Sequence, residues 1–220
     1  MIIAIDGPAA AGKSTLARKV AEALGLAFLD TGAMYRAVAL AALERGIDPE
    51  DAEGCARVAR GLGLDFDERR AIRIDGRPGE PAIRSTAVTR AVSPVSAHPG
   101  VRAALVPQQR AEARRRGGIV AEGRDMGTVV FPDADHKFFL VASAEERARR
   151  RALELGAPER LAEILEDVLR RDHLDSTRAD SPLRRASDAV EVATDGLAPD
   201  EVVQLVLAHV RRAPGARRAT

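Results

Sequence analysis

The sequence predicts an α/β fold with a doubly wound, five-stranded parallel sheet and a small inserted subdomain. Apolar runs of strand length recur along the chain, at residues 2–6, 27–30, 118–122, 137–142 and 189–193. Helical patterns fill most of the gaps between these runs, at residues 13–24, 33–45, 101–115, 144–155, 158–172 and 199–210. Strands that alternate with helices along a chain form a parallel sheet that is covered by helices.

One segment breaks this alternation and predicts the insertion. Residues 64–66 and 71–76 alternate in polarity like a small antiparallel ribbon, with turn signals at Asp75-Gly76 and Pro78-Gly79. We therefore expect a core at residues 1–56 and 94–212, with residues 57–93 as an inserted subdomain. The arginine-rich end of the chain, residues 213–220, contains a proline and a glycine and is expected to be a disordered tail.

Composition limits the partners that the protein can have. The formal net charge is +1 over 220 residues, so no global field favours nucleic acid or an anionic membrane. The single cysteine, Cys55, excludes an internal disulfide. No run of 18 apolar residues occurs, and the first residues already read as a core strand, so we expect a protein without a secretory leader. We expect a cytoplasmic monomer that binds small molecules through local charge.

A phosphate-binding motif follows the first predicted strand. The stretch Gly7-Pro8-Ala9-Ala10-Ala11-Gly12-Lys13-Ser14 matches G-x-x-x-x-G-K-[ST], and the predicted helix begins directly after it. In such a loop the backbone N–H groups cradle phosphates, the lysine reaches the β and γ phosphates and the hydroxyl can bind Mg²⁺. The nucleotide side is expected to comprise Gly7, Pro8, Ala9, Ala10, Ala11, Gly12, Lys13, Ser14 and Thr15.

Three further clusters place charged residues beside predicted elements: residues 30–36, 122–128 and 170–178. Asp30 and Glu122 end buried strands, where ligands of open α/β sheets bind, and Glu122 could serve as a magnesium partner with Ser14. Each cluster also has a simpler interpretation. Thr31 could cap a helix, the second cluster could be a salt-bridged loop, and the third could be a solvated helix on which Arg171, Asp175 and Arg178 share one face.

Together these clusters resemble one family, the bacterial cytidylate kinases, over nearly the whole chain. The resemblance is carried by Ile5-Asp6-Gly7-Pro8 with the phosphate loop, by Asp30-Thr31-Gly32-Ala33-Met34-Tyr35-Arg36, by the run from Glu122-Gly123-Arg124-Asp125-Met126-Gly127-Thr128 to Asp133, and by residues 171–178. It implies a P-loop kinase core, a substrate side built partly from the insertion, and a helical lid at about residues 156–178. It also implies an enzyme that phosphorylates CMP and dCMP with ATP and Mg²⁺. Thr31 departs from the serine that the family often has there.

Carried over residue by residue, the resemblance assigns a role to each polar side chain. Arg36 and Arg124 would bind the monophosphate, with Arg178 on that group or on the transferred phosphoryl. Ser93, Arg102 and Asp125 would read cytosine, and Thr31, Arg171 and Asp175 would hold the sugar. The cations expected to support catalysis are Lys13, Arg124, Arg147, Arg151, Arg171 and Arg178.

Other functions remain open at this point. A kinase with another small acceptor, such as a different nucleoside monophosphate or shikimate, fits the same phosphate loop. A GTPase switch would need an [NT]-K-x-D guanine reader, and Lys13, Lys19 and Lys137 are not preceded by Asn or Thr. A binding module without catalysis would not need Lys13 together with lid arginines.

Overall fold

The computed structural model of the protein describes residues 1–67 and 71–212. The expected disordered tail, residues 213–220, lies outside the described residues. The chain folds as two compact units. The first contains Met1–Phe28, Arg116–Thr177 and the described residues from Ser181 onward, and the second contains the described residues of Leu29–Arg115 together with Arg178–Asp180. The boundaries expected from the sequence, at residues 57 and 93, fall inside the second unit.

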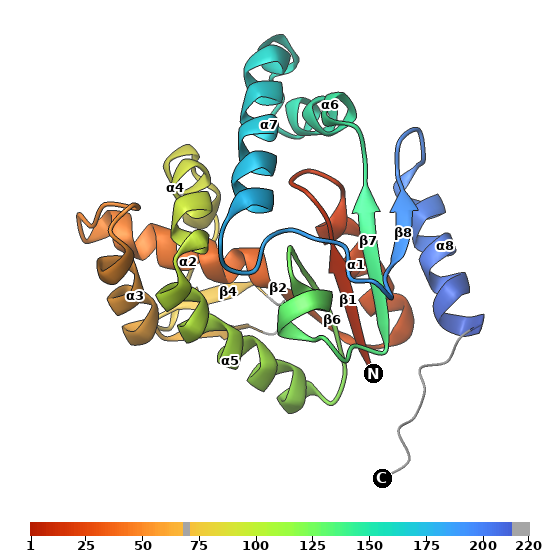
Figure 1. The fold of residues 1–220 in the computed structure, drawn as a ribbon, viewed down its shortest axis with the longest axis horizontal. Helices are drawn as coiled ribbons and strands as arrows, with labels where there is room; N and C mark the ends of the chain where they lie inside the picture. The colour runs from red at the N-terminus through yellow and green to blue at the C-terminus, as the bar shows by residue number, and fades with distance from the viewer. Residues whose placement is uncertain (68–70, 213–220) are drawn as a thin grey trace. The chain divides into compact units, whose positions relative to one another are not determined.

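The main sheet has five strands in the order β2-β6-β1-β7-β8 (Figure 1). Its strands are β1 (Ile2–Asp6), β2 (Ala27–Asp30), β6 (Ile119–Gly123), β7 (His136–Val141) and β8 (Val190–Ala193). The central strand β1 runs parallel to β6 and β7, with Asp6 opposite Gly123 on one side and Phe139 on the other. The predicted α/β fold with a parallel sheet is confirmed, and β1 ends between two strands whose carboxyl ends lie at the same edge.

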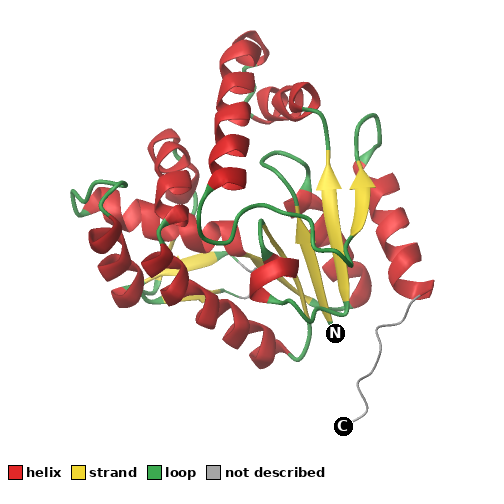
Figure 2. Ribbon diagram, viewed as in Figure 1, coloured by secondary structure: helices red, strands yellow, loops and turns green. Residues whose placement is uncertain are grey.

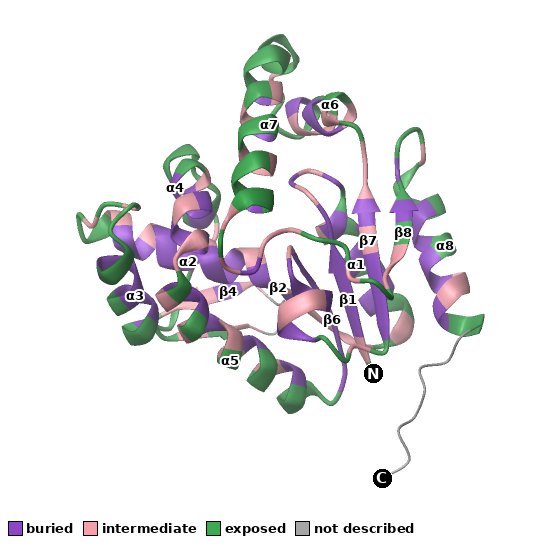
Figure 3. Cartoon of the chain, in the orientation of Figure 1, coloured by how far each residue is buried: buried purple, intermediate pink, exposed green. Residues whose placement is uncertain are grey.

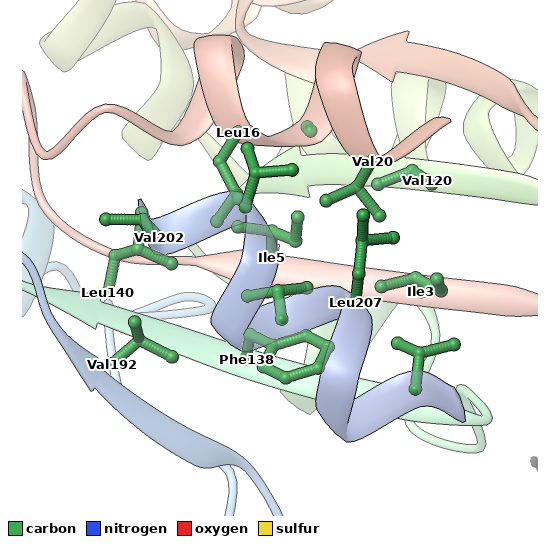
Figure 4. Packing of buried hydrophobic residues seen from close by; sticks show 14 of the residues in the cluster. Ile3, Ile5, Leu16, Val20, Val120, Phe138, Leu140, Val192, Val202 and Leu207 are labelled. Atoms are coloured by element: carbon green, nitrogen blue, oxygen red, sulfur yellow. The ribbon is translucent and has the colours of Figure 1, made fainter. Parts of the chain in front are cut away.

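Apolar side chains explain why the middle of this sheet is buried. Strand β6 is buried at every position, and β1 at every position but its first (Figure 3). Two helices of the first unit, α1 (Lys13–Leu24) and α8 (Pro199–Arg212), pack against each other beside the sheet. In Figure 4, Leu16 and Val20 of α1 point toward Ile3 and Ile5, and the α8 side chains join Phe138 of β7. Burying these side chains supplies the main stabilisation of the scaffold behind the phosphate loop.

The remaining helices of the first unit form a pair. Helix α6 (Ala144–Glu154) packs on α7 (Leu161–Thr177) through the small cluster Ala148, Ala152, Ile164 and Val168. A short 3₁₀ turn, η3 (Pro158–Arg160), connects them. The expected helix at residues 158–172 therefore begins as a separate turn and continues five residues further, to Thr177.

The second unit combines helices with a small antiparallel sheet (Figure 2). The sheet has the order β3-β4-β5, from Leu64–Phe66, Ile72–Ile74 and Arg77–Pro78. The alternating sequence predicts the antiparallel pair of β3 and β4, whereas the short third strand β5 includes Pro78, where a turn is expected. The helical elements are α2 (Thr31–Glu44), α3 (Ala52–Gly61), η1 (Ala82–Arg84), α4 (Thr86–Ala97) and α5 (Pro99–Arg116). Helices α3 and α4 were not expected from the sequence, and both pack against α2.

Across residues 1–67 and 71–212, the helices include none with the length and apolar character needed to cross a membrane.

Candidate active site

The phosphate loop leaves the carboxyl end of β1 and enters α1 through two glycines with special backbones. Gly7 has φ +150°, and a Cβ there would lie 2.6 Å from the carbonyl oxygen of Leu140, so any side chain would collide with β7. Gly12 has φ +87° and forms the N-cap of α1 without a side-chain cap. The first N–H groups of α1 are therefore not taken up by a cap side chain. Such N–H groups, together with the positive end of the helix dipole, bind phosphate.

Lys13 begins α1 and lies almost completely buried, with 6% of its surface exposed. Its Nζ donates a hydrogen bond of 2.6 Å to the carbonyl of Pro8, so the side chain folds back over the loop. The pKa of Lys13 is lowered to about 7, first by burial and then by the charge of Arg124. Glu122 and Asp175 act in the opposite direction. A bound phosphate would favour the charged ammonium in the same way, because an anion stabilises a nearby cation.

The segment after β6 forms the second part of the site. Glu122 lies in β6 opposite Ile5 and is 5% exposed. Asp125, which is 2% exposed, precedes a π-helical turn, η2 (Met126–Val130). The Asp6 carboxylate at the end of β1 accepts hydrogen bonds from the backbone N–H groups of Met126 and Gly127, at 2.8 and 2.7 Å. The turn is thereby fastened to the strand that carries the phosphate loop.

Arg124 pairs with Asp175 from the far end of α7. The Arg124 Nε donates to Asp175 Oδ2 at 2.6 Å, across 51 residues of sequence, and both side chains are largely buried. Burial lowers the pKa of Arg124, but the carboxylate of Asp175 outweighs it and the net shift is upward. Asp175 is thus buried, although most of α7 is exposed to solvent. Arg178 does not share a helix face with it, because α7 ends at Thr177.

Positive charge accumulates around the phosphate loop within the first unit. Burial lowers the pKa of Arg171, and the charges of Arg124 and Arg151 lower it further, although Asp175 opposes them. Arg124 has the same effect on Lys13. Cations that repel one another in this way favour a multiply charged anion among them, which relieves the repulsion.

Arg147 and Arg151 differ in how firmly they are held. Arg147 donates four hydrogen bonds: to the carbonyls of Ala142 and Ala9 at 3.0 and 3.2 Å, and to both carboxylate oxygens of Asp172 at 3.0 and 2.6 Å. It therefore ties α6 and α7 to the phosphate loop and has few donors left for a ligand. Arg151 makes an ion pair of 2.8 Å with the exposed Glu154. Contact of either arginine with the transferred phosphoryl stays a prediction.

The second unit holds the remaining predicted residues. Asp30 caps α2 by accepting a 2.9 Å hydrogen bond from Ala33 N–H, so Thr31, 2% exposed, is the first helical residue and not the cap. Arg36 Nη1 donates to the Thr89 hydroxyl at 3.1 Å. Ser93 is buried in α4. Arg178 belongs to this unit and is partly exposed.

Arg102 is the most enclosed arginine among these residues, with 3% exposure. Its guanidinium lies 5.3 Å from the centre of the Tyr35 ring and donates a 3.3 Å hydrogen bond to the carbonyl of Ser96. Asp180 Oδ1 lies 4.0 Å from its Nε. A cation that is stacked and bonded on several sides keeps one orientation, as a base-reading group requires.

Sequence reasoning missed the contribution of two residues. In the sequence, Asp6 ends a predicted strand and belongs to the Ile5-Asp6-Gly7-Pro8 motif, and Lys137 begins another predicted strand, but neither is assigned a contact. Lys137, 8% exposed, donates to the carbonyl of Pro132 at 2.6 Å and to the Asp188 carboxylate at 2.9 and 2.8 Å. A charged residue at the end of an otherwise apolar strand was the available signal, because such a residue must find a partner when it is buried.

Comparison with known proteins agrees with this arrangement. The sequence profile of a family described as cytidylate kinase matches residues 3–212. The chain belongs to the cytidylate kinase family. Two curated relatives are named bifunctional pantoate ligase/cytidylate kinase. The one from Synechocystis sp. is 50% identical over 215 residues, which are 94% of this chain and 42% of the relative. The one from Parasynechococcus marenigrum is 48% identical over 218 residues, 96% of this chain and 43% of the relative.

The chain thus spans less than half the length of the curated relatives that it matches. Among solved structures, a gluconokinase from Sinorhizobium meliloti superposes with a TM-score of 0.51 at 15% identity, over 96% of this chain and 93% of that one. At this low identity the likeness shows the fold alone. A P-loop kinase fold and membership of the cytidylate kinase family are consistent with each other.

Proposed function

We propose that the protein transfers the γ-phosphoryl group of ATP to CMP or dCMP, giving ADP and CDP or dCDP. The observation that carries this proposal is the group of buried or partly buried cations, Lys13, Arg124 and Arg171, around a phosphate loop in a cytidylate kinase family member. Phosphoryl transfer passes through a loose transition state with charge spread over the equatorial oxygens, so it requires positioned cations and no covalent nucleophile.

Ser14 and Glu122 are suited to hold Mg²⁺ together with the ATP phosphates. Both offer oxygen ligands, which Mg²⁺ prefers, and Mg²⁺ commonly uses only one or two protein side chains besides substrate phosphates. Ser14 follows Lys13 in the first turn of α1, and Glu122 lies one residue before the end of β6. The bound ion would neutralise charge that develops on the phosphates.

In this proposal Asp125, Arg102 and Ser93 recognise the cytosine base. Cytosine presents an amino donor at N4 and acceptors at N3 and O2, so its recognition requires a carboxylate together with donors. Asp125 supplies the carboxylate, while Arg102 and Ser93 supply the donors. Both ionic side chains are almost fully buried, which makes a mismatched base costly.

The phosphate and sugar of the acceptor are assigned to the other polar residues. Arg36 and Arg124 would bind the monophosphate, with Arg178, and Thr31, Arg171 and Asp175 would hold the sugar. Asp175 also orients Arg124 through their 2.6 Å hydrogen bond. The helical lid would exclude water when both substrates are bound and so limit ATP hydrolysis.

ADP release measured with a coupled assay tests the proposal. We expect turnover with CMP and dCMP, weak turnover with UMP and AMP, and none with shikimate. Turnover with shikimate or AMP but not with CMP would overturn it in favour of another acceptor. ATP hydrolysis that no acceptor stimulates would favour a nucleotide switch.

We further propose that the protein is a cytoplasmic monomer. Light scattering of the purified protein would test the oligomeric state.

A further inference from the structure

The π-helical turn η2 is held by an unusual buried contact. The Asp6 carboxylate uses one oxygen for the Met126 N–H and the other for the Gly127 N–H. Asp6 itself is 4% exposed. Two consecutive backbone N–H groups that converge on one anion fix the orientation of the peptide plane between them. The start of η2 therefore cannot rotate without breaking a charge-assisted hydrogen bond.

The other side of the turn is enclosed by Lys137. A Cβ placed on Gly127 would lie 3.1 Å from Lys137 Cδ and 3.4 Å from Asp6 Oδ2. Lys137 cannot easily yield, because its Nζ bonds to Pro132 and Asp188. Gly127 is thus confined between a carboxylate from β1 and an aliphatic chain from β7, so an added Cβ would force one of these neighbours to shift.

The backbone that is held in this way continues directly into Asp125 and Arg124. The Asp125 carbonyl accepts hydrogen bonds from Val129 and Val130 at 2.9 and 3.1 Å, so the backbone of Asp125 is part of the turn. A shift of Met126 and Gly127 would therefore be transmitted to the backbone of Asp125. A carboxylate that must meet one amino group needs its position fixed to well under an ångström.

We propose that Asp6 is a positioning residue for base recognition, which acts through the backbone of Met126 and Gly127 to fix where Asp125 and Arg124 lie. This inference rests on the proposed function for the role of Asp125. It assigns to Asp6 an effect on the monophosphate acceptor, although in sequence Asp6 adjoins the phosphate loop.

The electrostatic cost of Asp6 supports a functional role. The pKa of Asp6 is raised to about 6, mainly by burial, even though the Gly127 and Met126 N–H groups act to lower it. The charge of Asp125 contributes to this rise in pKa. A buried carboxylate that remains costly despite two good hydrogen bonds is typical of sites where position matters more than stability.

The test compares three variants of the purified protein. Asp6→Asn keeps the shape of the side chain but replaces one accepting oxygen with an NH₂ group. That group faces a backbone N–H and cannot accept its hydrogen bond. Gly127→Ala disturbs the same peptide from the opposite side. Thr128→Val is the matched control, since the Thr128 hydroxyl is buried in the same turn and has no hydrogen-bond partner among the described residues. Kinetic constants are measured for CMP, UMP and ATP, with melting curves to confirm folding.

We expect Asp6→Asn and Gly127→Ala to raise the KM for CMP and to lower the CMP over UMP ratio of kcat/KM by about tenfold. The KM for ATP should stay within about twofold, and Thr128→Val should match the wild type. A preserved CMP over UMP ratio with an altered KM for ATP would overturn the proposal, because Asp6 would then act on the phosphate loop. An equal loss of the ratio in Thr128→Val would overturn it too.

Amide hydrogen exchange separates this inference from the proposed function. The Met126 and Gly127 amides should exchange slowly in the wild type and at least about tenfold faster in Asp6→Asn, whichever acceptor the enzyme uses. If the wild type phosphorylates no cytidine nucleotide, the proposed function fails, while faster exchange of these amides in Asp6→Asn would still show that Asp6 fixes the backbone of Met126 and Gly127. Unchanged exchange would refute this positioning role.

Discussion

The surroundings of Lys13 favour the binding of a phosphate anion. Lys13 is buried beside Arg124, its pKa is lowered to about 7, and its ammonium rests on the Pro8 carbonyl. A side chain kept in this state gains more from a phosphate ligand than an exposed lysine would, because little water has to be displaced.

We expect Lys13→Ala to lower kcat by about 10² to 10³, since contacts to charge that develops in the transition state typically have this effect. The melting temperature should change little, because Lys13 packs at the loop and not in the apolar core. Lys19→Ala is the matched control on the same helix, where Lys19 is half-exposed and pairs with Asp200. Near-normal kcat in Lys13→Ala would rule out the assigned role of the phosphate loop.

The raised pKa of Asp6 predicts that the free energy of unfolding depends on pH. Its pKa is raised from 3.8 to about 6, first by burial. Between pH 6 and pH 4 the folded state therefore binds a proton that the unfolded state lacks, so stability rises as the pH falls. The rise is about 3 kcal/mol for one such group, and Lys13 stays protonated throughout this window.

Urea unfolding of wild type and Asp6→Asn at pH 7, 6, 5 and 4 measures this effect. The free energy of unfolding of the wild type, relative to the variant, should increase as the pH falls. Asparagine cannot take up the proton, so the variant serves as the reference for every other titrating group. Parallel pH profiles would show that Asp6 has an ordinary pKa.

At the scale of elements, strong periodicity predicted structure and weak periodicity did not. Helix α1 has the bounds that its apolar spacing indicates, and the strands agree within one residue. Helix α4 was missed because it contains Pro94, and α3 because it is short and glycine-containing. Each of these helices is fixed by a cap, Ser85 or Asp51, and by packing on α2, which the sequence does not reveal.

In the candidate site, too, the sequence predicts local features and does not reveal contacts between distant residues. The phosphate loop depends on consecutive residues, so its motif was sufficient to locate it. The contact of Arg124 with Asp175 and that of Asp6 with η2 join residues 51 and 120 positions apart or more, and both depend on the sheet order. No local pattern carries such information, and the arginine-rich composition hides which arginines are buried.

The α6 and α7 pair provides a prediction about an element. Arg147 joins both helices to the phosphate loop, and its side chain is 5% exposed. Arg147→Ala would leave Asp172 and two carbonyls without their donor, which we expect to cost about 3 kcal/mol of unfolding free energy. Denaturant unfolding of the wild type and the variant measures this change in the free energy of unfolding. Arg149→Ala, on the same helix, removes an exposed pair with Glu146 and should cost less than about 1 kcal/mol. Equal losses would contradict the connecting role.

At the scale of the whole molecule, the residues assigned to the base are divided between the two units. Asp125 belongs to the first unit, and Ser93 and Arg102 belong to the second. If all three read one base, variants in different units should alter the same kinetic quantity, the CMP over UMP ratio of kcat/KM. Variants confined to the ATP side should leave this ratio unchanged, because ATP is common to both reactions.

Asp125→Ala provides the sharpest test of base reading. Uracil carries a carbonyl where cytosine has the N4 amino group and an N–H where cytosine has the N3 acceptor. The wild type should therefore favour CMP by at least about 10², because two buried polar groups would lose their partners. Removing the carboxylate removes both its attraction to the N4 amino group of cytosine and its repulsion of the O4 carbonyl of uracil. The variant should therefore lose CMP activity and most of its preference for CMP over UMP. Ser93→Ala should lower the CMP over UMP ratio of kcat/KM less than Asp125→Ala does, since it removes a neutral donor. If Asp125→Ala keeps the full ratio, another residue reads the base, and the role proposed for Asp6 in base recognition fails with that of Asp125.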